Sequence, residues 1–169
     1  MKMKRFDVGA AIAGGRRNFI RDLWDRCAPL PGGHRLFSRV IGWAVPYTAT
    51  IHPEVVVLTR GRSEVLLKDR RRFRNHLNSL HAIALANLAE LAGNLALAYS
   101  MPDDARFIVS RIDVEYLKKA RGTIRAVCTC PVPESSERRE YEVAVSLRDP
   151  QGEEVARTRL TTLIGPKPA

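Results

Sequence analysis

Cysteine is scarce in this sequence, and its scarcity excludes a disulfide framework. The chain of 169 residues has only Cys27, Cys128 and Cys130, an odd number that suits a protein of the reducing cytoplasm. Cys128 and Cys130 are two residues apart on an expected strand, so their side chains face the same way. No second cysteine pair or neighbouring histidine in the sequence completes a metal site around them. We therefore expect buried thiols, no bound metal and a cytoplasmic localisation.

The sequence also lacks a hydrophobic run that is typical of a membrane span or a signal peptide. The first fifteen residues are basic and then apolar, but Asp7 interrupts the apolar stretch and Arg16 and Arg17 follow it, which disfavours a signal peptide. Residues 80–99 have the length of a membrane span. They contain polar side chains that would be costly in lipid, namely His81, Asn87, Glu90 and Asn94. We expect no membrane span there, but a helix buried by its own protein.

Acidic residues are few relative to basic ones, and the formal net charge is +10. Seven basic residues lie between Arg60 and Arg74, against only Glu64 and Asp69, which predicts an anionic partner without saying which one. Nucleic acid is the weakest candidate, because Phe73 is the only aromatic residue in the run and no nucleic-acid-binding motif accompanies it.

The order of apolar patterns predicts one domain with an N-terminal helical arm. Apolar residues repeat at helical spacing over 18–27 and 36–44, and Pro46 ends the second run. We assign residues 1–46 to an arm that packs on the main domain, residues 47–169. A lid over a ligand site and a contact with a membrane surface are the alternatives for the arm.

The main domain reads as two strands, one long helix and four strands. Strand-like runs at 47–51 and 54–59 precede a hairpin partner at 63–68, and the helix covers 79–99. Four strands follow at 106–117, 122–130, 141–147 and 153–164, the first with Ile108, Ile112, Val114 and Tyr116 on one face. Their short connections predict that successive strands are antiparallel neighbours. A single apolar helix with one antiparallel sheet indicates an α+β fold in which the sheet curls around the helix.

Three polar side chains share one side of this apolar helix. At about 100° per residue, Asn87 lies about 60° and Asn94 about 40° from Glu90. Such a stripe is either a hydrogen-bonded interface contact or a site in which Glu90 is a general base or nucleophile, with its pKa raised by burial.

The start of the same helix offers hydrogen-bond donors. Ser79 or Asn78 can cap the helix, and the free N–H groups near His81 and Ala82 could bind an anionic oxygen. We expect His81 to be structural rather than a base. A carboxylate combined with oxyanion donors suits cleavage of an activated carbonyl such as a thioester.

The spacing of Asn75, His81 and Glu90 resembles that of the hotdog-fold thioesterases of the phenylacetate-pathway type. Their signature is N-x-x-G-x-x-H-G-G, followed by Asp or Glu on the central helix. The resemblance covers residues 47–164, and residues 75–93 are closest to an uncharacterised bacterial branch of the superfamily. It implies a hotdog fold, in which about six antiparallel strands wrap around one central helix.

The resemblance further implies an acyl-CoA thioesterase without a cofactor, coenzyme A being part of the substrate. Asn75 would orient the substrate carbonyl or the attacking water, the Ala82 N–H would polarise the carbonyl, and Glu90 would be the general base or nucleophile. It also implies a homodimer, which can pair into a tetramer, with the site between two subunits. The acyl carrier is coenzyme A or an acyl carrier protein.

The sequence departs from the signature at three positions. Asn78 stands where the first motif glycine would be, and Ala82 and Ile83 replace the Gly-Gly pair, so that added side chains narrow the passage to the carbonyl. The alternative function is therefore a catalytically weak hotdog protein that binds acyl-CoA or another lipid-like ligand. The D-x-N-P-x-H signature of hydratase relatives and the G-x-S-x-G elbow of serine hydrolases are both absent.

Further binding residues follow from charge and polarity. The basic run would contact the phosphates of coenzyme A, or it is simply a solvated strand end. If strand alternation continues through it, Lys68, Arg70 and Arg72 share one face. The predicted substrate-binding residues are Arg70, Arg72, Arg74, Asn78, Asn87 and Asn94.

Overall fold

The computed structural model describes residues 17–168. Residues 1–16, which include the segment weighed as a signal peptide and the start of the predicted arm, lie outside the described residues. The chain forms these elements in order: α2 (Phe19–Cys27), α3 (Gly33–Ala44), α4 (Pro46–Ala49), β1 (Glu54–Thr59), β2 (Arg62–Leu67), a 3₁₀ turn η1 (Arg71–Phe73), α5 (Ala82–Ser100), β3 (Ala105–Tyr116), β4 (Ile124–Thr129), β5 (Arg139–Arg148) and β6 (Glu154–Pro166).

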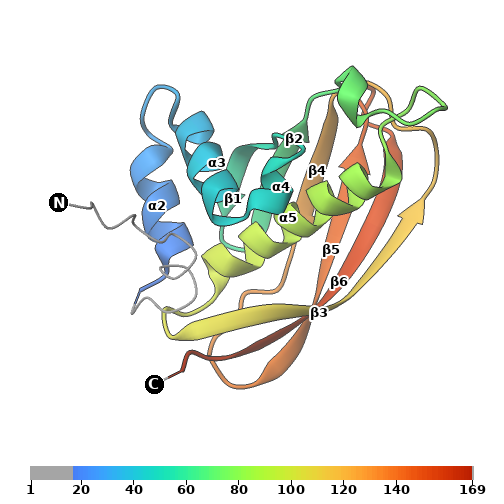
Figure 1. Cartoon of the computed structure of the whole chain (residues 1–169). Helices are drawn as coiled ribbons and strands as arrows, with labels where there is room; N and C mark the ends of the chain where they lie inside the picture. The colour runs from blue at the N-terminus through green and yellow to red at the C-terminus, as the bar shows by residue number, and fades with distance from the viewer. Residues whose placement is uncertain (1–16, 169) are drawn as a thin grey trace.

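A six-stranded antiparallel sheet curves around α5, as Figure 1 shows. Its strands lie in the order β1-β2-β4-β5-β6-β3, and each neighbouring pair is antiparallel. This confirms the predicted α+β class, the six strands and the single central helix. The predicted hairpin across Gly61 is also present, since Thr59 pairs with Arg62.

Alanine and leucine, both good helix formers, make up most of α5. The small alanine side chains allow the sheet to pack close to the helix backbone. The approach is close at Gly93, where an added Cβ would lie 2.2 Å from Cδ1 of Leu160 on β6. Leu88, Ala92 and Ala96 are fully buried. α5 is long and apolar enough to cross a membrane by length and composition, but 67% of that window is buried inside the protein.

The position of β3 corrects the predicted strand order. β3 does not pair with β4, its successor in the chain, but with β6, from Ala105 opposite Pro166 to Tyr116 opposite Ala156. The connection after β3 instead passes the start of α5, where the Ala120 carbonyl accepts hydrogen bonds from the Leu80 N–H (2.9 Å) and the Ser79 hydroxyl (3.0 Å). A short connection can therefore cross to the other half of a sheet that wraps around a helix.

A β-bulge corrects the expected face of β3. The register shifts between Val109 and Arg111, and an extra residue moves all later side chains to the other face. Ile112 and Tyr116 therefore lie opposite the buried Leu160 and Ala156, on the helix side. Ile108 lies on the outer side.

Two element boundaries also differ from the prediction. Residues 46–49 form α4 rather than part of a strand, because Pro46 occupies the first helical position, where its fixed φ favours a helix and its missing N–H costs nothing. The long helix begins at Ala82 and ends at Ser100, not at 79 and 99.

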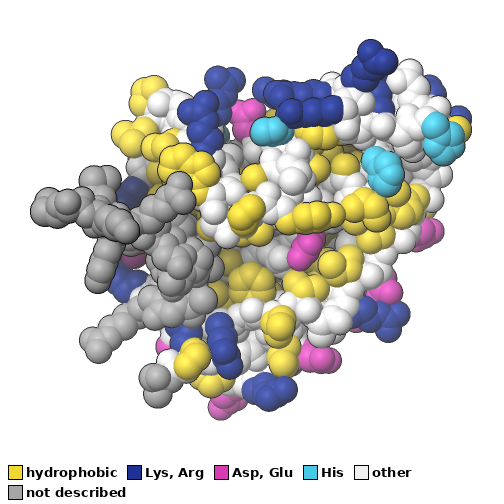
Figure 2. All heavy atoms as spheres, in the orientation of Figure 1, with side chains coloured by type: hydrophobic (Ala, Val, Ile, Leu, Met, Phe, Trp, Pro, Cys, Tyr) yellow, Lys and Arg dark blue, Asp and Glu magenta, His cyan; other side chains and the backbone are white. Residues whose placement is uncertain are grey.

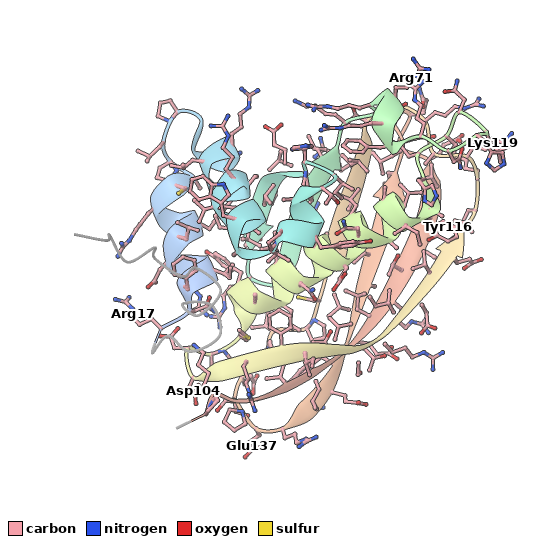
Figure 3. The ribbon with its side chains drawn as sticks, viewed as in Figure 1. Arg17, Arg71, Asp104, Tyr116, Lys119 and Glu137 are labelled. Carbon is pink, nitrogen blue, oxygen red and sulfur yellow. The ribbon has the colours of Figure 1, made fainter. Side chains whose placement is uncertain are left out.

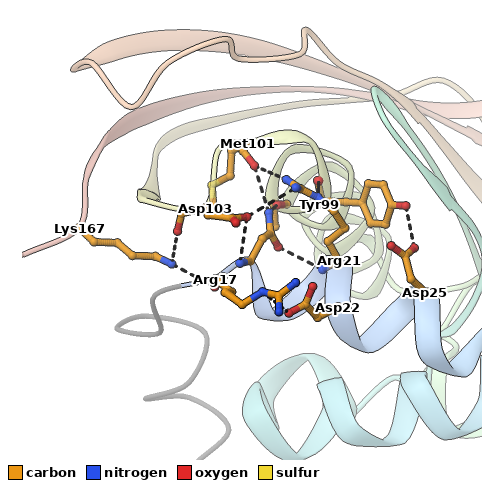
Figure 4. A network of polar contacts seen from close by, with 10 residues as sticks. Arg17, Arg21, Asp22, Asp25, Tyr99, Met101, Asp103 and Lys167 are labelled. Atoms are coloured by element: carbon orange, nitrogen blue, oxygen red, sulfur yellow. Dashed lines mark hydrogen bonds and ion pairs between the residues drawn. The ribbon is translucent and has the colours of Figure 1, made fainter.

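The start of α2 packs against the end of α5 through buried polar contacts, shown in Figure 4. The Asn18 side-chain amide donates to the carbonyls of Ala98 (2.6 Å) and Met101 (3.1 Å), while its oxygen accepts from the Arg21 N–H (3.1 Å) and caps α2. Trp24 and Phe37 are buried with them. The boundary between arm and domain at residue 46 remains a prediction.

Candidate active site

The loop before α5 is shaped by the side chain of Asn75. Its Oδ1 accepts hydrogen bonds from the N–H groups of Leu77 (2.9 Å) and Ser79 (3.2 Å), and the Asn75 N–H donates to the Ser79 carbonyl (2.8 Å). The amide oxygen is therefore occupied within its own loop. The Asn75 Nδ2 group has no acceptor among residues 17–168, and it is the part of the side chain that can contact a carbonyl or a water.

Asn78 has the backbone conformation that explains how it can stand in place of the motif glycine. Its φ is +54°, in the left-handed region that glycine adopts freely and that asparagine tolerates better than most residues. Its side-chain oxygen accepts a hydrogen bond from Arg74 (2.9 Å). The turn is thus preserved without glycine.

His81 caps α5, which corrects the prediction of a Ser79 or Asn78 cap. The His81 Nδ1 accepts from the Ile83 N–H (3.2 Å), while the His81 N–H donates to the Phe73 carbonyl (2.8 Å). Ser79 is unavailable because its hydroxyl donates to Ala120. An Nδ1 that accepts a hydrogen bond requires the proton on Nε2, which supports a structural role for His81.

The Ala82 N–H is in the first turn of α5, where backbone donors have no partner inside the helix. No acceptor in the described chain hydrogen-bonds to the Ala82 N–H. This group is therefore free to donate to an anionic oxygen that approaches the positive end of the helix dipole. Tyr116, at the end of β3, lies beside this turn (Figure 3) and its hydroxyl donates to the Ala82 carbonyl (3.0 Å). This bond ties β3 to the helix start, and sequence reasoning missed it.

The polar stripe of α5, defined as Asn87, Glu90 and Asn94, faces the gap between the helices and the sheet. On one side of it, Leu91 lies against α3, α4 and β1, and on the other side Gly93 lies against Leu160 and Val143. At about 100° per residue, Glu90 and Asn94 point between these two directions. Among residues 17–168, neither the sheet nor helices α2 to α4 enclose the Glu90 side chain, which is half-buried.

The stripe carries polar groups that lack partners. Glu90 is half-buried rather than enclosed, and its carboxylate makes no hydrogen bond or ion pair with residues 17–168. The Oδ1 atoms of Asn87 and Asn94 are buried and have no hydrogen-bond partner among residues 17–168. Within the same residues, the Asn87 Nδ2 reaches only the Tyr47 carbonyl, at 3.5 Å. Unpaired buried polar atoms are rare in folded proteins, and these amide oxygens could accept hydrogen bonds from a bound molecule.

Exposed apolar side chains surround the stripe. Ile83 is 55% exposed and lies about 20° from Glu90 around the helix. On the helix side of β3, Ile112 and Tyr116 are also exposed, at 41% and 46%. Figure 2 shows the apolar side chains that gather over this face. The surroundings of Glu90 suit an acyl chain or an apolar partner surface.

A pocket of about 190 Å³ beside the stripe brings together residues from three parts of the chain. Four of the predicted site residues line it, Arg72, Arg74, His81 and Asn87, together with α4 and η1 residues such as Tyr47 and Phe73. The other predicted site residues do not line it: Asn75, Asn78, Ala82, Glu90, Asn94 and Arg70. Sequence reasoning missed Tyr47 because the segment was interpreted as a strand, although the Pro46 beside it is a helix-start signal.

The basic run does not continue β2, so the predicted alternation of Lys68, Arg70 and Arg72 is wrong. β2 ends at Leu67 and η1 follows. The Arg72 guanidinium lies over the Phe73 ring, 4.7 Å from its centroid. A turn replaces the strand because the chain must bend back toward the start of α5.

Arg74 is engaged by its own protein. Its Nε lies 2.7 Å from the Asp69 carboxylate, whose other oxygen accepts from the Gly122 N–H (2.9 Å). The hydrogen bond with Arg74 is the largest cause that lowers the pKa of Asp69, and it raises the pKa of Arg74. Arg74 therefore fixes the loop that holds Asn78, whereas Arg70 has no acidic partner among residues 17–168 and Arg72 lies over Phe73.

The cysteines of the C-x-C pair lie in the core. Cys128 and Cys130 are buried on β4 and just beyond it, which confirms the expectation of buried thiols. Among residues 17–168, no three His, Cys, Asp or Glu side chains are grouped so that they could hold a metal ion.

Comparison with known proteins identifies a family and a fold. A family model described as "Domain of unknown function (DUF4442)" matches residues 33–164, from α3 to β6. No curated protein matches the chain.

Three solved structures illustrate the similarity. A structural-genomics protein is 32% identical with a TM-score of 0.76, over 88% of this chain and 99% of its own. A Pseudomonas aeruginosa protein of unknown function, called a probable thioesterase, is 22% identical with a TM-score of 0.69, over 81% of this chain and 97% of its own. The Escherichia coli PaaI protein of the phenylacetic acid degradation operon is 14% identical with a TM-score of 0.61, over 77% and 92%. These similarities confirm the predicted hotdog fold.

Proposed function

Because the chain belongs to the DUF4442 family and has the hotdog fold, we propose that it is an acyl-CoA thioesterase. The observation that carries the proposal is the polar stripe, in which the Glu90 carboxylate has no partner in the described chain and two buried amide oxygens flank it without donors. The thioesterase names of several structures with this fold support the same reaction class.

In the proposed reaction, Glu90 is a general base that takes a proton from water as the oxygen attacks the thioester carbonyl. The Ala82 N–H donates a hydrogen bond to the oxyanion that forms on the carbonyl oxygen, and Asn75 Nδ2 orients the water or the carbonyl. The C–S bond then breaks, and the leaving thiolate takes the proton from Glu90. The products are a carboxylic acid and the free thiol of the carrier. A direct attack by the Glu90 carboxylate is the variant in which Glu90 is the nucleophile.

The geometry of α5 favours a site shared between two copies of the chain. Ala82 and Glu90 are eight residues apart on one helix, which is about 12 Å at 1.5 Å per residue. One carbonyl cannot lie within hydrogen-bond distance of Ala82 and next to Glu90 of the same helix. We therefore propose that the Ala82 of one subunit works with the Glu90 of the other in a cytoplasmic homodimer, which can pair into a tetramer.

The experiment is thiol release from a panel of acyl-CoAs and acyl carrier protein thioesters, compared between the wild type and Glu90→Gln. The proposal expects release by the wild type and a loss of about 10²-fold or more in kcat for the variant, since a general base contributes about that much. Equal rates for Glu90→Gln and the wild type would refute the role of Glu90.

The second candidate is a hotdog protein that binds acyl-CoA or another lipid-like ligand without turning it over. It is favoured by Ile83, a large side chain at a position where the thioesterase signature has glycine. Saturable binding of an acyl-CoA with no thiol release from any thioester in the panel would support this candidate over the enzyme.

A further inference from the structure

A second hollow lies between α3 and the ends of β1 and β2. We call it the basic groove and define it by Arg35, Arg39 and Trp43 of α3, Glu54 of β1, and Lys68 and Arg70 after β2. Its volume is about 590 Å³, within the range of about 300–1,000 Å³ typical of small-molecule sites. Figure 2 shows the band of Lys and Arg side chains, with a histidine beside it, that runs along this edge of the molecule.

The groove has an excess of positive charge. Its one acidic side chain, Glu54, lies 3.5 Å from the Arg35 Nε and 3.3 Å from the Lys68 Nζ. Arg39 and Arg70 have no acidic partner within residues 17–168. Four cations against one carboxylate leave an excess of three positive charges, which an anion with more than one charge would balance.

His52 lines the same groove, and its pKa is affected by the positive charge there. Burial lowers the pKa of His52 most, and the charges of Arg72 and Arg70 lower it further. His52 also has φ +49°, an uncommon conformation for a non-glycine residue, of a kind that gathers at functional sites. The groove thus combines a positive field with a constrained backbone.

Trp43 provides a flat apolar surface at the mouth of the groove. The residue is 76% exposed. Such exposure is unusual, because tryptophan is a large side chain that usually buries much of its apolar surface. An indole next to arginines is a combination that stacks on a heteroaromatic base while the guanidinium groups bind phosphate.

We propose that the basic groove binds a nucleotide that carries at least two phosphates, with its base on Trp43 and its phosphates between Arg39 and Arg70. Two sources share this chemistry, a free nucleoside diphosphate and the nucleotide end of coenzyme A. The second source rests on the proposed function. It is consistent with the position of α4, because Ala49 lines the groove while Tyr47 lines the pocket beside Asn87.

The experiment measures binding through tryptophan fluorescence and requires no turnover. The chain has two tryptophans, and Trp24 is buried, so a surface ligand quenches Trp43. At low ionic strength, ADP and coenzyme A are expected to quench the emission saturably, whereas adenosine and phosphate-free pantetheine do not. Tighter binding of coenzyme A than of ADP assigns the groove to the thioester carrier, and equal or tighter binding of ADP assigns it to a free nucleotide.

Arg39→Gln and Arg70→Gln are each expected to weaken nucleotide binding about tenfold, the effect of losing one charge-assisted hydrogen bond. Arg106→Gln is the matched control, because Arg106 is exposed and lies on β3, at the opposite edge of the sheet. The control is expected to bind like the wild type.

Any of three results would overturn the inference. The first is no quenching by ADP or coenzyme A up to about 1 mM, a Kd that corresponds to a binding free energy of only about 4 kcal/mol. The others are an equal loss of nucleotide affinity in Arg39→Gln and Arg106→Gln, and quenching by single-stranded RNA or anionic vesicles but not by ADP. Hydrolysis of an acyl-pantetheine, which has no nucleotide, tests the proposed function separately. The groove can thus fail while hydrolysis is found, and hydrolysis can fail while nucleotide binding is found.

Discussion

Replacing Asn87 by leucine should make the protein more stable and less active. The Asn87 Oδ1 is buried without a partner, and its Nδ2 makes only a 3.5 Å contact with the Tyr47 carbonyl. An unsatisfied buried amide destabilises the folded state by about 1–3 kcal/mol, and leucine is a better helix former by about 0.4 kcal/mol. The pocket of about 190 Å³ next to Asn87 has room for the larger side chain.

We therefore expect Asn87→Leu to raise the free energy of unfolding by about 1–3 kcal/mol, measured by urea denaturation at two protein concentrations. If the proposed function is right, thiol release should fall by about tenfold or more, because the variant loses an amide that we propose contacts the substrate. Asn87→Ala is the companion variant, since it removes the amide without filling the pocket. If both variants destabilise the protein equally, the amide oxygen is satisfied in solution and the inference of an unpaired polar stripe is wrong.

Three further changes test other parts of the structure. Asn18→Ala should lower the free energy of unfolding by about 2–3 kcal/mol, because it removes a helix cap and leaves the Ala98 carbonyl without its donor. Asn18→Asp keeps the cap and should recover part of this loss in urea denaturation. If Asn18→Ala leaves the stability unchanged, this packing of α2 is wrong. Arg74 lowers the pKa of Asp69 in the folded state, so the stabilising contribution of Asp69 is present above its unfolded pKa and is lost as the pH falls through its folded pKa. The stability of Asp69→Asn should therefore depend less on pH below about 4 than that of the wild type. Identical acid transitions of the two proteins would refute this. Ile83→Gly should raise kcat/KM if the side chain narrows access to the Ala82 N–H, and it should destabilise the helix by about 0.5 kcal/mol. Unchanged kinetics would show that the departure from the glycine motif does not limit the reaction.

The elements that local chemistry controls were predictable from the sequence. The long, almost continuously apolar segment of α5 and the alternation of the strands indicated the α+β class and the central helix, because both patterns are properties of consecutive residues. The resemblance around Asn75, His81 and Glu90 indicated the hotdog fold. The predicted cap was wrong because capping depends on which side chain is free, and a tertiary hydrogen bond to Ala120 occupies Ser79.

The pairing of β3 with β6 could not be read from the lengths of connections, since a connection that crosses the start of a helix is as short as a hairpin. The face of Ile108 depended on a bulge that no local pattern indicated. Likewise, the basic run looked like a strand end, but its cations are divided between a pocket beside Asn87, a loop contact at Asp69 and the basic groove.

Local sequence patterns specify one apolar helix, the strands around it, and a carboxylate between two amides on one side of that helix. Which of these polar groups find partners depends on how the elements pack together. Periodicity tells which side chains share a face of one element, whereas pairing depends on what other elements bring to that face. That is why Arg74 is engaged with Asp69, the Glu90 carboxylate has no partner among residues 17–168, and Arg39 and Arg70 line one groove although they are far apart in the sequence.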